Sequence, residues 1–301
     1  MANTAIDLLR DWKRIADQPS GIGPRRLNLW ATHARLRLAT LTQGSNQSGE
    51  FDVLGWRVGH LGLGSLYHLY REIFVDRIYG MALGVPAPTI IDCGSNIGMS
   101  ILHFKTLYPQ ARVIGFEPHP VVHEVLQRNI ERNALASVVV HRLALGAEVG
   151  TLQFFIQAGD PGALNMGLFA GSAAAQAITV QAERLSHFID AEVDLLKLDI
   201  EGAEEMVLQE LAQAGKLRQV RRIVCEYHHH IDSGIDRLSH TLATLEAAGF
   251  GYQIGAHAER PVGLRCYQDV VIYAYRKDDA RMATPQDSWP PDGQTDTPKP
   301  E

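Results

Sequence analysis

The sequence has few cysteines and no pattern that would put them to use. Its 301 residues include only Cys93, Cys225 and Cys266, and no two of them form a CxxC pair. This is too few for a disulfide framework or a thiolate zinc site, so we expect all three to be structural and reduced. The chain also lacks any apolar run approaching the roughly 18 residues that span a bilayer, and any basic stretch leading into an apolar run at its start. We therefore expect a cytoplasmic protein that does not contact a membrane.

Positive charge is also scarce. The chain has 28 lysines and arginines against 34 aspartates and glutamates, a formal net charge of -6 at pH 7, and no sustained basic run. A protein that binds nucleic acid by neutralising phosphates needs such a basic surface. We therefore expect no nucleic-acid partner, and predict a small-molecule or glycan substrate.

The two ends of the chain differ in composition from the middle. Residues 1–85 start with apolar residues at mostly helical spacing on both sides of a break at 19–24, followed by short strands and a helix over 66–79. We predict an N-terminal helical cap over this region. The cap is apolar, and its Trp12 and Trp30 could pack against a second subunit, so a homo-oligomer is an open alternative. A catalytic domain should follow over 86–280. The last residues, 281–301, are polar and rich in proline, which is typical of a disordered tail.

From residue 89 onward, strands and helices alternate, which predicts an α/β fold with a parallel sheet covered by helices on both faces. The expected sheet has seven strands, mostly parallel, with an antiparallel last strand. Strands are predicted at 89–93, 112–116, 137–142, 195–198, 222–227, 250–254 and 268–275, and helices at 98–108, 121–133, 203–214 and 235–248. An insertion over 151–181 carries two further predicted strands, at 152–156 and 178–180. Insertions of this length are usually functional or disordered.

A glycine-containing turn follows the first of these strands. Asp92 stands near the end of that strand, and Gly94 and Gly98 bracket the turn into the next helix. Glycine lets a ligand approach the backbone closely, and the first N–H groups of a helix are unpaired. The second strand leads into Glu117, about twenty residues past the glycines, where an acid can accept hydrogen bonds from both ribose hydroxyls. This spacing predicts an adenosine ligand.

The details of the turn distinguish two adenosine cofactors. A nicotinamide dinucleotide favours the pattern G-x-G-x-x-G, but position 97 is Ile here. The methionine part of S-adenosylmethionine needs a nearby acid and amide, which Asp92 and Asn96 supply. After the third strand, Ala144 and Leu145 suit an adenine wall, although they suit a core equally well. We therefore predict S-adenosylmethionine, with a nicotinamide-dependent oxidoreductase as the alternative.

An ordered set of motifs runs through residues 72–275. It consists of Asp92-x-Gly94-x-Asn96-Ile97-Gly98, Phe116-Glu117-Pro118, Arg128-Asn129 with Asn133, Ala144-Leu145-Gly146 and Leu196-Lys197-Leu198-Asp199-Ile200-Glu201-Gly202-Ala203-Glu204. This set resembles the FkbM family of S-adenosylmethionine-dependent O-methyltransferases. The resemblance implies a Rossmann-like class I methyltransferase fold and methyl transfer to a hydroxyl of a carbohydrate or secondary metabolite. The predicted cofactor-binding residues are Asp92, Gly94, Ser95, Asn96, Gly98, Ser100, Glu117, Pro118, Ala144, Leu145 and Asp199.

Acidic residues follow the fourth strand, at the edge where open α/β sheets bind their ligands. Asp199 and Glu201 are two residues apart, so an extended backbone places both carboxylates on one side, toward the transferred methyl group. They also precede a helix, where acids stabilise the N-terminus by about 0.3–1 kcal/mol, so capping is the alternative interpretation. We interpret Glu204 as a solvated or capping acid.

The fifth strand ends in Glu226 and a run of histidines. Alternation along a strand places Glu226, His228 and His230 on one side. Methyl transfer to an alcohol requires alignment of the reactants and a base for the hydroxyl proton, and we predict His228, with an ordinary pKa near 6.5, as that base. The predicted catalytic residues are His228, Asp199, Glu226 and Glu201.

Three questions stay open at this point. Asp199, Glu226 and His228 offer ligand types that suit Mg²⁺ or Mn²⁺, but no ligand spacing demands a metal, and we expect none. A module that binds S-adenosylmethionine but has lost catalysis is a further alternative. The acceptor is expected to contact the helical cap, the insertion with Asn165 and Met166, and the histidines of the fifth strand, but the sequence does not identify it.

Overall fold

The structure is a computed structural model that describes residues 4–16, 24–157, 159–160, 162–164, 166–168, 175–229, 231, 237–256 and 268–279. The predicted tail over 281–301 lies outside these residues. So do Cys266, His230 and Asn165. Within the described residues, no helix has both the length and the apolar character needed to cross a membrane.

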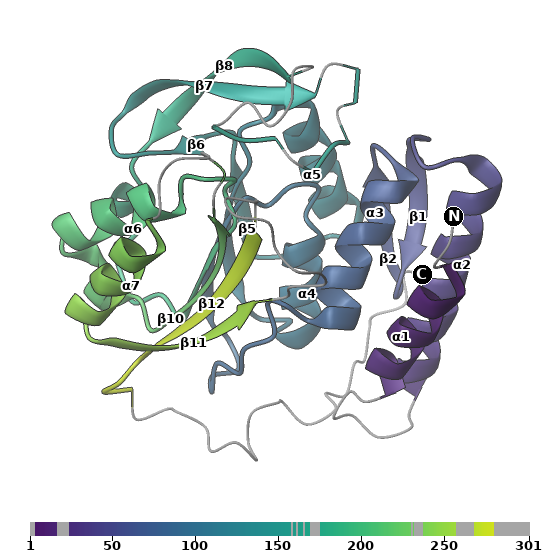
Figure 1. Ribbon diagram of the computed structural model, residues 1–301, viewed down its shortest axis with the longest axis horizontal. Coiled ribbons are helices and arrows are strands. Elements are labelled where there is room, and N and C mark those ends of the chain that lie inside the picture. The colour runs from purple at the N-terminus through teal and green to yellow at the C-terminus, as the bar shows by residue number, and fades with distance from the viewer. Residues whose placement is uncertain are drawn as a thin grey trace.

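Seven strands form the central sheet, in the order β11-β12-β10-β9-β3-β4-β5 (Figure 1). Their bounds are β3 (Thr89–Cys93), β4 (Arg112–Phe116), β5 (Val138–His141), β9 (Leu195–Leu198), β10 (Arg222–His229), β11 (Phe250–Ala256) and β12 (Gln268–Arg276). Only β12 runs antiparallel to its neighbours, β10 and β11, whereas the pairs β3–β4, β3–β9, β4–β5 and β9–β10 are parallel. The predicted Rossmann-like class I methyltransferase fold is therefore confirmed.

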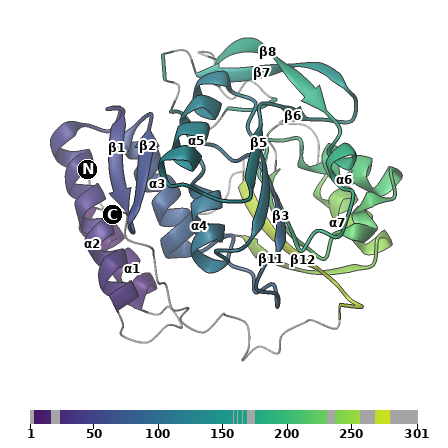
Figure 2. The same cartoon turned by 180° about the vertical axis from the view of Figure 1, so that it is seen from behind.

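Helices cover both faces of this sheet (Figure 2). One face carries α4 (Met99–Leu107) and α5 (Pro120–Arg132), and the other carries α6 (Glu204–Gln213) and α7 (Leu238–Ala247). Neighbouring residues of β3 illustrate why the middle of this strand is apolar: Ile90 belongs to the core on the α4 side and Ile91 to the core on the α6 side, and both are fully buried. Strands buried on both faces are continuous apolar runs.

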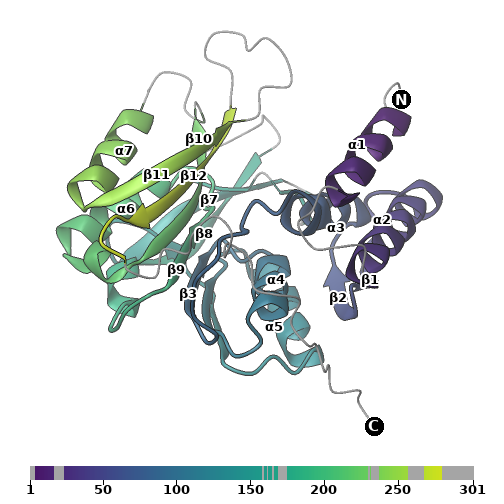
Figure 3. The same ribbon diagram turned by 90° about the horizontal axis from the view of Figure 1, so that it is seen from below.

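The N-terminal region lies beside α4 and α5, on the side away from α6 and α7 (Figure 3). It contains α1 (Thr4–Ala16), α2 (Pro24–Gln43), β1 (Gly49–Val53), β2 (Trp56–His60), α3 (Leu63–Tyr70) and a π-helical turn (Arg71–Asp76). Asn129 of α5 ties β2 to the rest of the chain, because its side chain accepts from Gly59 N at 2.7 Å and donates to Gly59 O at 3.0 Å.

The helix predicted over 66–79 needs correction at both ends. It begins at Leu63, widens into the π-helical turn and stops at Arg77, which has a left-handed φ of +57°. A non-glycine residue in that conformation ends a right-handed helix. Tyr79 therefore lies beyond the helix, where its side chain can reach the ends of the central strands.

The insertion forms a small separate sheet at the top of Figure 1. Its strands are β6 (Ala144–Leu145), β7 (Gly150–Gln157) and β8 (Ala175–Glu183), in the order β6-β8-β7. Both predicted strands of the insertion are present and longer than predicted. Short 3₁₀ turns at Leu185–Phe188 and Lys216–Gln219 complete the connections around β9.

The described cysteines are free and buried. Cys93 and Cys225 are fully buried in the core on the α6 side, and burial raises the pKa of both thiols well above the ordinary value. Because the thiolate is the reactive form, both are inert packing residues, as predicted.

Candidate active site

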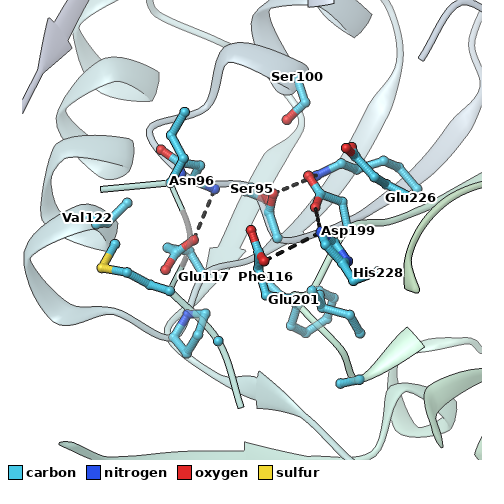
Figure 4. A pocket seen from close by; sticks show the side chains of 18 of the residues that line it. Ser95, Asn96, Ser100, Phe116, Glu117, Val122, Asp199, Glu201, Glu226 and His228 are labelled. Carbon is cyan, nitrogen blue, oxygen red and sulfur yellow. Dashed lines mark hydrogen bonds and ion pairs between the residues drawn. The ribbon is translucent and has the colours of Figure 1, made fainter. Parts of the chain in front are cut away.

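A cavity of about 480 Å³ opens where β3, β4, β9 and β10 end (Figure 4). The turn after α3 contributes one wall, through Glu72 and Tyr79, and the insertion contributes another, through Leu164, Met166 and Leu168. Ligand pockets typically measure about 300–1,000 Å³, and in open α/β sheets they lie at this edge. The cavity is therefore the candidate site for a small-molecule ligand.

The turn after β3 packs closely against the segment after β9. Gly94 has a φ of +83°, and a Cβ at this position would lie 1.8 Å from the carbonyl oxygen of Asp199. The backbone N–H groups of Gly94 and Ser95 donate to the carbonyl of Phe116 at 3.0 and 2.8 Å. Only glycine allows this approach, which brings the ends of β3, β4 and β9 together around the cavity.

Two predicted cofactor residues lie behind the cavity wall rather than on it. The Asp92 carboxylate is fully buried, accepts a hydrogen bond from Ser100 Oγ at 2.6 Å, and lies 3.2 Å from Lys197 Nζ. Gly98, with a φ of +94°, stands at the start of α4. Neither residue lines the cavity. The expectation that Asp92 meets the methionine moiety therefore needs correction, because its carboxylate is already committed to Ser100 and Lys197.

Lys197 is a buried cation whose part in the site the sequence analysis missed. It is 1% exposed, donates to Gly94 O at 2.6 Å, and lies 3.2 Å from both Asp92 and Asp199. Burial by itself would lower its pKa, but the two carboxylates raise it, so the ammonium stays charged. A lysine inside an apolar strand was the available signal, since lysine is almost never buried without a partner.

Glu117 presents a carboxylate to the cavity from the end of β4. It accepts from Asn96 N at 3.0 Å through Oε2 and from His119 N at 2.9 Å through Oε1. Burial raises its pKa to about 7, while these backbone hydrogen bonds and Lys197 oppose the rise. Each carboxylate oxygen has two acceptor positions, so one on each oxygen stays available for a ligand.

Apolar side chains line the cavity near Glu117. Ala144 and Leu145 of β6 are 5% and 4% exposed, and they lie on the wall together with Phe116 and Pro118. These side chains give the wall an apolar surface, which suits packing against a planar base. Ala144 and Leu145 also belong to the two hydrophobic cores, so the core and wall interpretations both hold.

His228 lies at the end of β10 among carboxylates. Its Nε2 is 3.5 Å from Glu201 Oε2 and 3.8 Å from Asp199 Oδ1, ion pairs that Figure 4 marks with dashed lines. Its Nδ1 is 2.8 Å from Glu204 Oε1. Burial by itself would lower its pKa, but Glu204, Glu201 and Asp199 together raise it well above 6.5. These carboxylates therefore favour the imidazolium form of the ring.

The carboxylates around His228 have unequal affinities for protons. Burial favours the neutral form of Asp199, but Lys197 and His228 outweigh it and lower the pKa. Burial raises the pKa of Glu201 to about 8, and burial together with Asp199 raises the pKa of Glu226 well above its usual range. Asp199 is thus the stable anion, while the two glutamates can hold protons.

Tyr79 adds a hydroxyl to this cluster. Its OH donates to Asp199 Oδ2 at 2.8 Å and lies 3.4 Å from Glu226 Oε2. Nothing local in the sequence indicated its contact with Asp199, because the two residues are 120 positions apart.

The interpretation of Glu204 as a solvated or capping acid also needs correction. It is 1% exposed rather than solvated, and its carboxylate accepts from Ile200 N and Gly202 N as well as contacting His228. The capping interpretation holds, but it covers only part of what this side chain does.

The structure therefore brings most of the predicted site residues to one cavity. Those that line it are Gly94, Ser95, Asn96, Ser100, Glu117, Pro118, Ala144, Leu145, Asp199, Glu201, Glu226 and His228, together with Met166 of the insertion. Glu226 and His228 both face the cavity, while Tyr227 between them packs into the core on the α6 side.

Among the residues that the structure describes, carboxylate and imidazole atoms come within 4.8 Å of one another in two overlapping groups. One comprises Asp199, Glu201 and His228, and the other comprises Glu226, His228 and Asp269. Such donor atoms are of the type that divalent cations accept. In the first group, however, they are already paired with one another and with Lys197, so the geometry does not call for a cation.

The sheet order and the cavity at the strand ends define a class I methyltransferase. The sequence profile of the methyltransferase FkbM domain matches residues 92–252, more than half of the chain. The chain therefore belongs to the methyltransferase FkbM family.

Named relatives come from bacteria and fungi. The 31-O-demethyl-FK506 methyltransferase FkbM of Streptomyces tacrolimicus is 31% identical over 233 residues, which cover 65% of this chain and 86% of that protein. Methyltransferase 1 of Beauveria bassiana (strain ARSEF 2860) is 33% identical over 166 residues, 48% of this chain and 66% of the relative. The chain thus spans slightly less than two thirds of this fungal protein. Methyltransferase FkbM from Methylobacillus flagellatus KT aligns with a TM-score of 0.44 at 17% identity, over 81% of this chain and 60% of that one.

Proposed function

We propose that this protein transfers a methyl group from S-adenosylmethionine to a hydroxyl of a carbohydrate or secondary metabolite. One observation carries the proposal: Glu117 and His228 lie on the wall of the same cavity. The carboxylate of Glu117 can accept hydrogen bonds from ribose hydroxyls, and the imidazole of His228 can accept a hydroxyl proton. An O-methyl transfer requires recognition of the methyl donor and activation of the acceptor hydroxyl. The same cavity thus contains a residue suited to each task.

The wall chemistry fits the parts of the donor. Glu117 has two free acceptor positions for the two ribose hydroxyls, and Ala144 and Leu145 offer an apolar surface for adenine. Asp199 and Asn96 supply the acid and the amide that the amino and carboxylate groups of the methionine part need. Asp199 takes the role that Asp92 cannot fill.

The residues around His228 suit the transfer of a proton from the acceptor hydroxyl to the imidazole. Bound S-adenosylmethionine supplies an electrophilic methyl group on a positively charged sulfur. The acceptor oxygen forms the bond to the methyl carbon, the electron pair of the broken bond stays on sulfur, and the hydroxyl proton passes to His228 Nε2. The carboxylates of Asp199 and Glu204 stabilise the resulting imidazolium. Because the same carboxylates favour the protonated ring beforehand, the reactive neutral form increases as the pH rises.

Two observations support a hydroxyl compound as the methyl acceptor: the name of a relative and the chemistry of the cavity wall. The Streptomyces relative is named for O-methylation of a demethylated FK506, which is a hydroxyl acceptor. In this chain, Met166, Leu164 and Leu168 give the insertion side of the cavity an apolar surface. This mixture of apolar wall and carboxylates suits a polyhydroxylated compound with apolar parts.

The first test is cofactor binding. Calorimetry should show that the protein binds S-adenosylmethionine and S-adenosylhomocysteine and does not bind NADH. Binding of NADH without S-adenosylhomocysteine would establish the oxidoreductase alternative instead.

The second test is turnover. The protein is incubated with S-adenosylmethionine and a panel of sugars, glycosides and macrolide alcohols, and mass spectrometry follows S-adenosylhomocysteine and methylated product. We expect acceptor-dependent formation of both, greatly reduced in His228→Gln. Cofactor binding without turnover on any hydroxyl compound would favour the catalytically silent binding module.

A further inference from the structure

The Glu204 carboxylate connects two parts of the candidate active site. Its Oε1 accepts from Ile200 N at 3.0 Å, and both of its oxygens lie 3.1 Å from Gly202 N. These bonds fold the turn that carries Asp199 and Glu201. The same Oε1 lies 2.8 Å from Nδ1 of His228, which comes from the neighbouring strand.

This contact determines which way the imidazole faces. Glu204 is 1% exposed and does not line the cavity, so its carboxylate is held by the backbone behind the wall. An ionised carboxylate only accepts hydrogen bonds, so His228 must donate through Nδ1–H. The remaining nitrogen, Nε2, then points toward Asp199, Glu201 and the cavity.

We propose that Glu204 is a positioning residue that holds His228 with Nδ1–H directed away from the cavity and Nε2 directed into it. The catalytic consequence rests on the proposed function, because only a base needs a defined nitrogen at the substrate. The contact itself does not depend on that function. An acid that only capped α6 would not need to reach a side chain on β10.

Several other charged groups face His228, and they must be considered in any titration. They are Asp199 and Glu201 after β9, Glu226 on β10 itself, and Asp269 on β12. Among the described residues, Glu204 is the one whose carboxylate touches Nδ1 at hydrogen-bonding distance. It should therefore be the group that determines the tautomer.

The test is nuclear magnetic resonance of the full chain labelled with ¹⁵N-histidine and saturated with S-adenosylhomocysteine. The His228→Gln variant identifies the resonances of His228. In the wild-type protein, we expect a slowly exchanging Nδ1–H, and on raising the pH the proton should be lost from Nε2. In Glu204→Gln, the neutral ring should change to a mixture of tautomers, and its pKa should fall by about 1–3 units, the usual effect of an opposite charge at this distance.

Glu205→Gln is the matched control. Glu205 is the next residue of α6 and pairs with Arg237 and His240 rather than with His228, so this variant should leave the His228 resonances unchanged. Glu204→Asp keeps the charge on a shorter arm and should restore part of the wild-type pKa.

Unchanged tautomer and pKa in Glu204→Gln would overturn the proposal. If that variant does not fold, the wild-type spectrum still decides, because a neutral His228 that carries its proton on Nε2 is incompatible with the proposed orientation. Failure of the proposed function would instead appear as absence of S-adenosylhomocysteine binding in calorimetry, which the contact between Glu204 and His228 does not affect.

Discussion

The protonation state of Glu117 should control how tightly the protein binds its cofactor. Its carboxylate is buried, its pKa is raised to about 7, and two of its four acceptor positions are taken by backbone N–H groups. Ribose hydroxyls donate to the ionised form, whereas the protonated form keeps fewer acceptor positions. A proton therefore competes with the ligand.

The size of the effect follows from the pKa. With a pKa of about 7, roughly nine tenths of Glu117 is ionised at pH 8 and roughly one tenth at pH 6. If only the ionised form binds, the dissociation constant of S-adenosylhomocysteine should rise about tenfold from pH 8 to pH 6, equivalent to about 1.4 kcal/mol. The sign is fixed: affinity is present above the pKa and is lost as the pH falls through it.

Isothermal titration calorimetry with S-adenosylhomocysteine measures this dependence directly, because the ligand itself does not titrate between pH 6 and 8. The Glu117→Gln variant should bind more weakly at pH 8 and should lose the pH dependence. Glu124→Gln removes an exposed acid of α5 and should behave like the wild-type protein. An affinity that is independent of pH in the wild type, or a Glu117→Gln variant that retains the tenfold change, would refute the assignment of Glu117 to the ribose.

Other predictions concern the buried lysine, the glycine turn after β3, the pH dependence of catalysis and the effect of a divalent cation. Lys197→Met leaves the buried carboxylate of Asp92 without its cation and should cost about 3–5 kcal/mol of unfolding free energy, measured by urea denaturation; a loss below about 1 kcal/mol would contradict the pairing. Gly94→Ala places a Cβ against the carbonyl of Asp199 and should abolish S-adenosylhomocysteine binding in calorimetry. Once an acceptor is found, kcat/KM should increase with pH through a value above 6.5, because His228 must lose its proton first, and a flat profile would exclude it as the base. EDTA and millimolar Mg²⁺ should leave the unfolding temperature unchanged, since a cation bound to the folded state would raise it.

The strands of the central sheet could be predicted closely because their signals are local. Residues 89–93, 112–116 and 195–198 are apolar or nearly so and are bounded by polar or turn-forming residues, and their predicted bounds agree with β3, β4 and β9. The helix over 66–79 was predicted less well, because the π-helical turn and the left-handed Arg77 do not interrupt the helical periodicity. Because the helix ends at Arg77, Tyr79 lies in the site and not on the surface of a helix.

The sequence by itself determined the fold class and the edge of the sheet at which the acids gather, since both follow from apolar periodicity and from the polar residues that end each strand. Only the tertiary structure decided what each acid does. Asp92 lies near the end of β3 and Glu117 directly follows β4, yet Asp92 is neutralised by Lys197, a residue more than 100 positions away, whereas Glu117 faces the cavity. Glu204 has the local signature of a helix cap, and its contact with His228 depends on the packing of α6 against β10. Pairing and burial decide such roles, and they arise from contacts between segments that are distant in the sequence.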